Sequence, residues 1–249
     1  MREIIEQGLH EWKMIPEDQR KPGAQKVPDL DTRDPKFNRK PPAGGLIVNV
    51  HARILDRDVK SGYVRGTCKT QGGENASRDH LWLTAQEWKS LIPAAPKKGD
   101  RSPVPPAIAD RIARFHLTDN TRGEPPMWER EHVRSKQMTL TIEEATPTNL
   151  LLRVDGAVLL STHPEANKAE RGYEAQLLGY IGYDRSKKAI TRFDVVAIGE
   201  HWGDSNNPGA RPGRTPLGIA FALAQGESAA NAVPPKGARA WIEYLGRDR

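Results

Sequence analysis

Apolar and polar residues alternate along one early segment and along most of the second half of the chain. In residues 45–56, Val48, Val50, Ala52 and Ile54 occupy every second position, which is the period of a strand with one buried face. From residue 137 onward, runs rich in β-branched and aliphatic residues follow one another with turn residues between them. Six strands are predicted there, over residues 137–145, 149–154, 157–162, 173–184, 189–202 and 216–224.

Two connections indicate how these strands should pair. Asp155-Gly156 separates the second run from the third, and this dipeptide is a strong signal for a two-residue hairpin. The link DRSKKA between the fourth and fifth runs is too short for a crossover helix. The sequence therefore predicts a mainly β (α+β) fold, in which an antiparallel meander forms a sandwich or a partly closed barrel.

Two short helices are predicted between the first strand and the meander. Thr84 followed by Glu87 forms a capping box at the start of one helix. The second helix begins at a proline pair, and its Ile108, Ile112 and Phe115 fall on one face. Both helices are available to cover the sheet.

The N-terminal region has a different composition. Residues 3–14 fit a short amphipathic helix, and residues 15–45 are rich in Pro, Lys, Arg and Asp with few apolar anchors. We therefore expect an extended N-terminal arm over residues 1–40 and a single β-rich domain over residues 41–249.

The chain is basic, with a formal net charge of +6 and a pI near 9.4. Its basic residues are interleaved with acids, and the longest basic runs are pairs such as Lys97-Lys98. Because nucleic-acid binders usually concentrate Lys and Arg on one face, we expect no sequence-specific binding to nucleic acid. A small anionic ligand fits the charge better. No apolar stretch approaches the roughly 20 residues that span a bilayer.

Cys68 is the only cysteine, so the chain has no intrachain disulfide and no metal site made of cysteines alone. A single thiol fits a reducing cytoplasm. The N-terminal residues carry acids and no apolar run of the kind that a secretory signal contains. We expect a cytoplasmic protein, and the alternative is an exported protein whose signal is absent from this chain.

The histidines and the cysteine offer one set of candidate metal ligands. His80 enters a strand, His116 ends a helix and His201 ends a strand, while Cys68 lies in a Gly-rich loop. Imidazole and thiolate suit a transition metal such as zinc or copper. No histidine pair has the spacing of a helical or strand motif, so the alternative is that each histidine makes a single structural hydrogen bond.

Two loops offer candidate ligand-binding residues. The loop that contains Arg122 ends at Trp128, and the long loop after Trp202 contains Arg211 and Arg214 among Gly and Pro. Arginines in a stiffened loop can bind a carboxylate or phosphate through two parallel hydrogen bonds. The alternative is that they tie the loops to the body through acids or backbone carbonyls. We predict that His116, His201, Arg122 and Arg214 line one concavity with aromatic walls.

The leading interpretation is a β-rich binding protein with a ligand or metal site at one end of the sheet. The sequence has no nucleophile elbow and no phosphate-binding glycine motif, so it identifies no enzyme class. One alternative is a metal-dependent enzyme that uses His80, His116 and His201, with Cys68 as a further ligand. A second alternative is a structural or interaction protein.

Four blocks carry a resemblance to known sequences: ASRDHLWLTAQEW, RFHLTDNTRGEPPMW, RFDVVAIGEHWG and RPGRTPLG. They resemble an uncharacterised family of planctomycete-type bacterial proteins, over residues from about 10 to 240. The resemblance implies a bacterial origin, and it implies no activity, cofactor or fold.

Overall fold

The computed structural model describes residues 2–21, 23–24, 39–60, 62–66, 76–121, 123–203, 211, 213–226, 228–240 and 243–245. The chain divides into two units, residues 1–38 and residues 39–249. The first unit contains helix α1 (Arg2–Met14) and a short 3-10 turn, η1 (Glu17–Arg20). Helix α1 confirms the amphipathic helix predicted there, and its apolar side chains are exposed.

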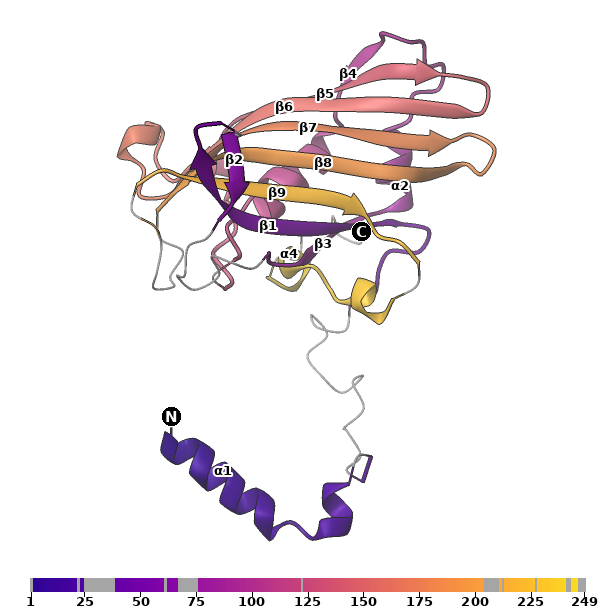
Figure 1. Cartoon of the computed structure of the whole chain (residues 1–249). Helices are drawn as coiled ribbons and strands as arrows, with labels where there is room; N and C mark the ends of the chain where they lie inside the picture. Colours follow the sequence, from indigo (N-terminus) through magenta and orange to yellow (C-terminus); the bar gives the residue numbers. More distant parts are fainter. Residues whose placement is uncertain are drawn as a thin grey trace. The chain divides into compact units, whose positions relative to one another are not determined.

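One antiparallel sheet forms the second unit (Figure 1), with nine strands in the part of the chain that the structure describes. Its strands are β1 (Leu46–Asp58), β2 (Gly62–Arg65), β3 (Asp79–Leu83), β4 (Arg101–Pro103), β5 (Val133–Ala145), β6 (Asn149–Ser161), β7 (Gly172–Asp184), β8 (Ala189–Trp202) and β9 (Thr215–Leu223). They lie in the order β2-β1-β9-β8-β7-β6-β5-β4, and β3 pairs with β1. The predicted meander is confirmed from β5 to β9.

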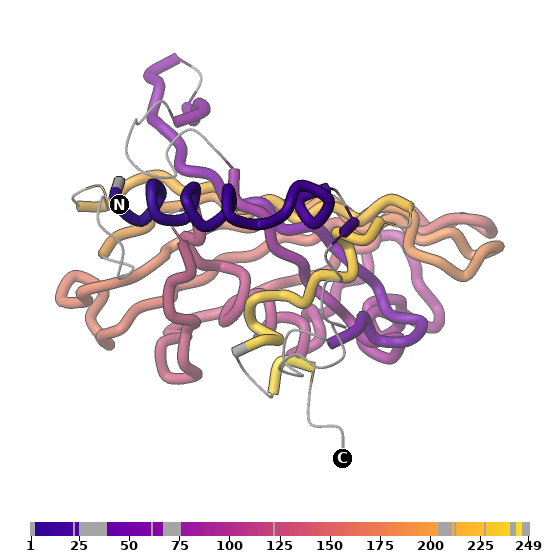
Figure 2. The backbone as a smooth tube through the Cα atoms, turned by 90° about the horizontal axis from the view of Figure 1, so that it is seen from below, coloured from indigo at the N-terminus to yellow at the C-terminus, as the bar shows by residue number. Residues whose placement is uncertain are grey.

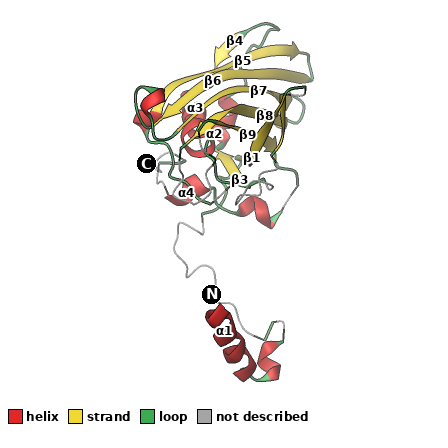
Figure 3. Ribbon diagram, turned by 60° about the vertical axis from the view of Figure 1, so that its left-hand side comes forward, coloured by secondary structure: helices red, strands yellow, loops and turns green. Residues whose placement is uncertain are grey.

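The sheet curves without closing into a barrel, because no described residue of β4 pairs with β1, β2 or β3 at the opposite edge. Figure 3 shows α2 (Ala85–Ser90) and α3 (Pro106–Arg111) inside the curve. Figure 2 shows the C-terminal segment, with 3-10 turn η7 (Ala229–Ala232) and α4 (Lys236–Ala240), on this same side. The core therefore lies between the inner face of the sheet and these helices.

The capping box predicted for α2 is present. The Thr84 hydroxyl accepts a hydrogen bond from the Glu87 amide at 3.2 Å, and the Glu87 carboxylate accepts one from the Thr84 amide at 2.8 Å. Among the described residues, no helix combines the length and the apolar character needed to cross a membrane.

The hairpin predicted at Asp155-Gly156 is wrong, because both residues lie inside the continuous strand β6. The two runs on either side of them are one strand, which pairs with β5 and β7 along its length. A Cβ at Gly156 would overlap the backbone carbonyl of Gln137 on β5. The glycine therefore permits a close approach between two strands and makes no turn.

The second predicted helix is present, and its apolar residues Ile108, Ile112 and Phe115 are buried, but its second half is not an α-helix. Helix α3 continues into a π-helix, η4 (Ile112–His116), and every residue of that π-helix is buried. The π-helix contacts β3, β5 and α4 and has no solvent-facing stripe. Arg111 at the end of α3 and Arg114 and His116 in the π-helix are buried, so their polar groups must find partners inside the protein.

Candidate functional site

A layer of buried polar side chains lies at the end of the sheet where β8 finishes. His201 is 5% exposed, and it pairs with Tyr173 on β7 and with Thr215 on β9. The Tyr173 hydroxyl donates to the carbonyl oxygens of Ala197 and Leu217 at 3.2 and 3.0 Å. Burial raises the pKa of Tyr173 well above its usual value, so this hydroxyl stays protonated and keeps both bonds.

A small enclosed hollow lies beside His201, with room for about one water molecule. Its polar lining includes Asp119, His201 and Arg211. Asp119 follows the π-helix, and its Oδ1 accepts hydrogen bonds from the Thr121 amide at 3.0 Å and from the Thr121 hydroxyl at 2.6 Å. The carboxylate is thereby fixed in place at the wall of the hollow.

Arg171 is the buried cation of this layer. The residue is only 7% exposed, and its Cζ lies 3.9 Å from the centre of the Trp128 ring, in cation–π contact. Burial lowers the pKa of Arg171 to about 10, and the charge of Asp119 acts in the opposite direction. Its Nε and Nη2 atoms have no hydrogen-bond partner among the described residues.

The backbone places Arg171 next to the hollow. Gly203 lines the hollow and has a φ of 89°, and a Cβ there would overlap the backbone of Glu170 and Arg171. Only glycine permits both this conformation and this approach. Arg171 also lies two residues before Tyr173, whose side chain is buried, so the alternation of β7 directs Arg171 to the same inner face.

Lys236, at the start of α4, is a second buried cation in this region. Its Nζ donates to the Pro125 carbonyl at 2.6 Å, and it is 9% exposed. Burial lowers the pKa of Lys236 to about 8, against the opposing charges of Glu124 and Asp79, while the Arg171 charge lowers it further. Two cations thus lie within electrostatic range of one another inside the protein.

A separate polar cluster surrounds the end of the π-helix. His116 Nε2 lies 2.6 Å from the Tyr244 hydroxyl, and His116 Nδ1 lies 3.5 Å from the Asp79 carboxylate. Burial acts to raise the pKa of Asp79, but contact with His116 and the amides of Lys236 and His80 outweigh it and lower the pKa. Since the His116 side chain is fully buried and contacts both Tyr244 and Asp79, this cluster holds β3, η4 and the C-terminal segment together.

Arg111 belongs to the same cluster. Its guanidinium makes hydrogen bonds of 2.5 and 2.6 Å to both Glu87 carboxylate oxygens, one of 3.0 Å to the Trp82 carbonyl and one of 2.6 Å to the Tyr244 carbonyl. All three guanidinium nitrogen atoms of Arg111 therefore have hydrogen-bond partners within the protein.

Most of the predicted ligand-binding residues are engaged in structural contacts. Arg211 donates to Asp56 and to two backbone carbonyls at 2.8–3.2 Å, and Arg214 donates to Glu174 at 2.8 Å while stacking on Trp202. The Trp128 indole is fully buried and donates to the Leu117 carbonyl at 2.7 Å. The two loop arginines therefore tie their loop to the body, and Arg122 lies outside the described residues.

The predicted metal ligands do not come together. Among the described residues, no three His, Cys, Asp or Glu side chains are grouped so that they could hold a metal ion, and Cys68 lies outside those residues. His80 and Asp79 are successive residues of β3 and face opposite ways, so His80 is directed away from His116. Burial lowers the pKa of His80.

His116 and His201 also lie at different levels of the sheet. The His116 ring contacts Phe221, whereas His201 pairs with Thr215. These two β9 residues are six positions apart, which is about 20 Å along a strand. A first-row metal ion, whose bonds to histidine are about 2 Å long, cannot bridge that separation. The shared concavity predicted for them is therefore not formed by these two histidines.

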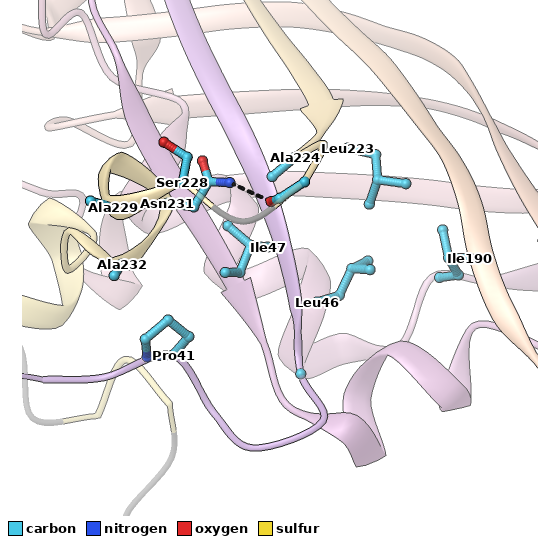
Figure 4. Close-up of a pocket in the computed structure, with 12 residues that line it drawn as sticks. Pro41, Leu46, Ile47, Ile190, Leu223, Ala224, Ser228, Ala229, Asn231 and Ala232 are labelled. Atoms are coloured by element: carbon cyan, nitrogen blue, oxygen red, sulfur yellow. Dashed lines mark hydrogen bonds between the residues drawn. The ribbon is translucent and has the colours of Figure 1, made fainter.

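A larger hollow lies elsewhere, beyond the end of β9 (Figure 4). It has a volume of about 530 Å³, and apolar side chains such as Leu46, Ile190 and Leu223 line it. Its polar side chains are Ser228 and Asn231, and the Asn231 amide already donates to the Gly226 carbonyl at 3.2 Å. The described part of its lining contains no charged side chain that would select a ligand.

Arg171 and Lys236 were not found from the sequence as site residues. Arg171 directly precedes a strand, at a position that the alternation of β7 assigns to the buried face, and an arginine at such a position is a detectable signal.

The chain matches no known protein family, no curated protein and no solved structure.

Proposed function

We propose that this protein binds a small anionic ligand, through a carboxylate or phosphate group that contacts Arg171 at the end of the sheet. One observation carries the proposal: a buried guanidinium with Nε and Nη2 unpartnered among the described residues. A buried donor without a partner costs roughly 1–3 kcal/mol. An oxyanion would offset that cost, because it accepts two parallel hydrogen bonds from an arginine fork.

The surroundings support an anion over a neutral ligand. Trp128 covers one face of the guanidinium, so the remaining donors lie in the plane of the group. Lys236 adds a second positive charge within electrostatic range. The carboxylates near the two cations are already engaged, because Asp119 bonds to Thr121, Glu124 pairs with Arg239, and Asp79 contacts His116.

Thermal unfolding and calorimetry in a chloride buffer, with added phosphate, sulfate or acetate, test this proposal. A ligand that binds only the folded state raises the unfolding temperature, and the stabilisation grows with the logarithm of one plus the ratio of its concentration to Kd. We expect at least one anion to stabilise the native protein and the Arg171→Met variant to lose that response. Arg214→Met is the matched control, since Arg214 stacks on Trp202 at 3.8 Å but is paired with Glu174.

Two results would contradict the proposal. One is an anion response that persists in Arg171→Met at the size seen in the native protein. The other is the lack of any response in native protein at anion concentrations up to tens of millimolar, which would mean that Arg171 and Asp119 form a self-sufficient structural contact.

A further inference from the structure

A second cationic region lies along β5, which only the three-residue strand β4 separates from the edge of the sheet. On this side β4 pairs with Thr139–Thr141, and the flanking backbone bonds reach only Ile142 at one end and the Met138 carbonyl at the other. Residues 133–137 of β5 therefore have a strand, β6, on one side only. The other side of this stretch is a free backbone edge in the described structure.

A hollow of about 280 Å³ lies beside this free edge. Four cations line it, and they are Arg114, Arg130, Arg134 and Lys136. The only carboxylate in the described lining is Asp110, which pairs with Lys136. With that pair counted as neutral, three arginines remain in the lining, and two of them share the Glu243 carboxylate.

An internal carboxylate already shows which chemistry these cations accept. Glu243, from the C-terminal segment, bridges Arg114 and Arg130 with two contacts of 2.8 Å. Hydrogen bonds from Arg130 and Arg114 lower the pKa of Glu243. Because Arg130 is 69% exposed at its side chain and Glu243 is 33% exposed, an incoming carboxylate can compete for Arg130 without opening the core.

We propose that the free edge of β5 and the adjoining cationic hollow bind an acidic peptide segment in extended conformation. The peptide backbone would pair with residues 133–137, as in other cases of strand addition. Carboxylates at alternate positions, which share one face of a strand, would contact Arg130, Arg134 and Lys136. This site uses different residues from the Arg171 site and does not depend on it.

The free edge of β5 also has features that disfavour pairing with a neutral strand. Pairing with β6 shifts between Val133 and Ser135, which makes Arg134 the extra residue of a β-bulge. Bulges and lysines on an edge strand discourage pairing with neutral strands, because the lysine charge would lose its solvent. An acidic strand removes that penalty, since its carboxylates pair with the same charges. The edge therefore selects for negative charge.

Fluorescence anisotropy with the full chain and a labelled octapeptide of alternating Glu and Thr tests the proposal. We expect saturable binding, and at least about tenfold weaker binding to the double variant Arg130→Gln/Lys136→Gln, equivalent to about 1.4 kcal/mol. Arg214→Gln/Lys187→Gln removes the same two charges from exposed positions elsewhere and should bind the peptide almost as native protein does. Glu243→Gln should bind it severalfold more tightly, because the competing carboxylate is gone.

Two further probes distinguish strand addition from simple charge attraction. An octapeptide with the same glutamates but proline at two threonine positions lacks backbone donors and should bind at least severalfold more weakly. A single-stranded oligonucleotide of equal charge should bind more weakly than the acidic peptide. The proposal fails if the proline peptide or the oligonucleotide binds as well as the original, if both double variants lose binding equally, or if native protein and Glu243→Gln show no binding.

Discussion

The region around Arg111 and the region around Arg171 each hold a buried arginine against an aromatic ring. We call the Arg111 region complete because its guanidinium has hydrogen-bond partners on all three nitrogen atoms, and the Arg171 region incomplete because its guanidinium does not. Arg111 is 4% exposed and lies 5.1 Å from the Tyr244 ring, while Arg171 is 7% exposed and lies 3.9 Å from the Trp128 ring. Arg111 donates to a bidentate carboxylate and to two carbonyls. Arg171 keeps two nitrogen atoms without a partner among the described residues.

This difference separates a structural arginine from a candidate binding arginine. Glu87 is tied to the start of α2 by its capping box, so Arg111 joins a helix, a strand and the C-terminal segment through groups that are already fixed. Arg171 joins no such set. Burial alone therefore says little about function, whereas burial with unmet donors indicates a place where something else can bind.

The largest effect is expected when the complete region is broken. Arg111→Met would remove the cation that pairs with the Glu87 carboxylate. It would also leave the backbone carbonyls of Trp82 and Tyr244 without the hydrogen bonds that Arg111 donates to them. Removing one partner of a buried ion pair costs about 3–5 kcal/mol. Urea unfolding of the full chain measures this loss, and a loss below about 1 kcal/mol would show that the region around Arg111 does not stabilise the fold.

A smaller loss is expected at Tyr244. The Tyr244→Phe variant keeps the ring but leaves His116 Nε2 buried without the hydroxyl at 2.6 Å, which costs roughly 1–3 kcal/mol. Tyr173→Phe is the matched control, because its hydroxyl bonds only to two carbonyls within the sheet. We expect the Tyr244 variant to unfold at lower urea than the Tyr173 variant. The reverse order would contradict the role assigned to His116.

The contrast between the two regions also explains what the sequence could predict. The capping box at Thr84 and the alternation of β1 are local patterns, so the sequence predicts them correctly. The turn predicted at Gly156 is wrong because a glycine is needed there for the close approach of the β5 backbone, which lies about twenty residues away in the chain. The surroundings of Arg171 come from Asp119, Trp128 and Gly203, and only the fold brings these residues to one place.

The histidines show the same limit. Their positions at element ends suggested a shared metal, but strand alternation turns His80 away from Asp79, and register separates His201 from His116 along β9. Neither fact is visible without the strand pairing. Residue types alone indicate which ligand or metal a site could bind, and the sheet register decides whether those residues come close enough together to form the site.

The pH dependence of stability probes the incomplete region through Lys236. Its pKa is lowered to about 8 in the folded protein, from an ordinary value of 10.5, so between these values the unfolded chain binds the proton and the folded protein does not. The free energy of unfolding should therefore rise from pH 8 to pH 10.5, by about 1 kcal/mol after allowance for solvent screening. The difference between native protein and Lys236→Met isolates this contribution from other groups. An equal pH profile for both proteins would mean that Lys236 titrates as it does in water.

The smallest effects are expected from Arg171 and Arg214 in a buffer without binding anions. Arg171→Met loses the contact with Trp128, which contributes about 2 kcal/mol when desolvated, but it also removes two unmet donors that cost a similar amount. The net change in unfolding free energy should lie within about 1 kcal/mol, far below that of Arg111→Met. Arg214→Met breaks an exposed pair and should change stability by less than about 0.5 kcal/mol. If Arg171→Met instead destabilised the protein as strongly as Arg111→Met, the two regions would be alike, and Arg171 would be a structural arginine whose partners are already in place.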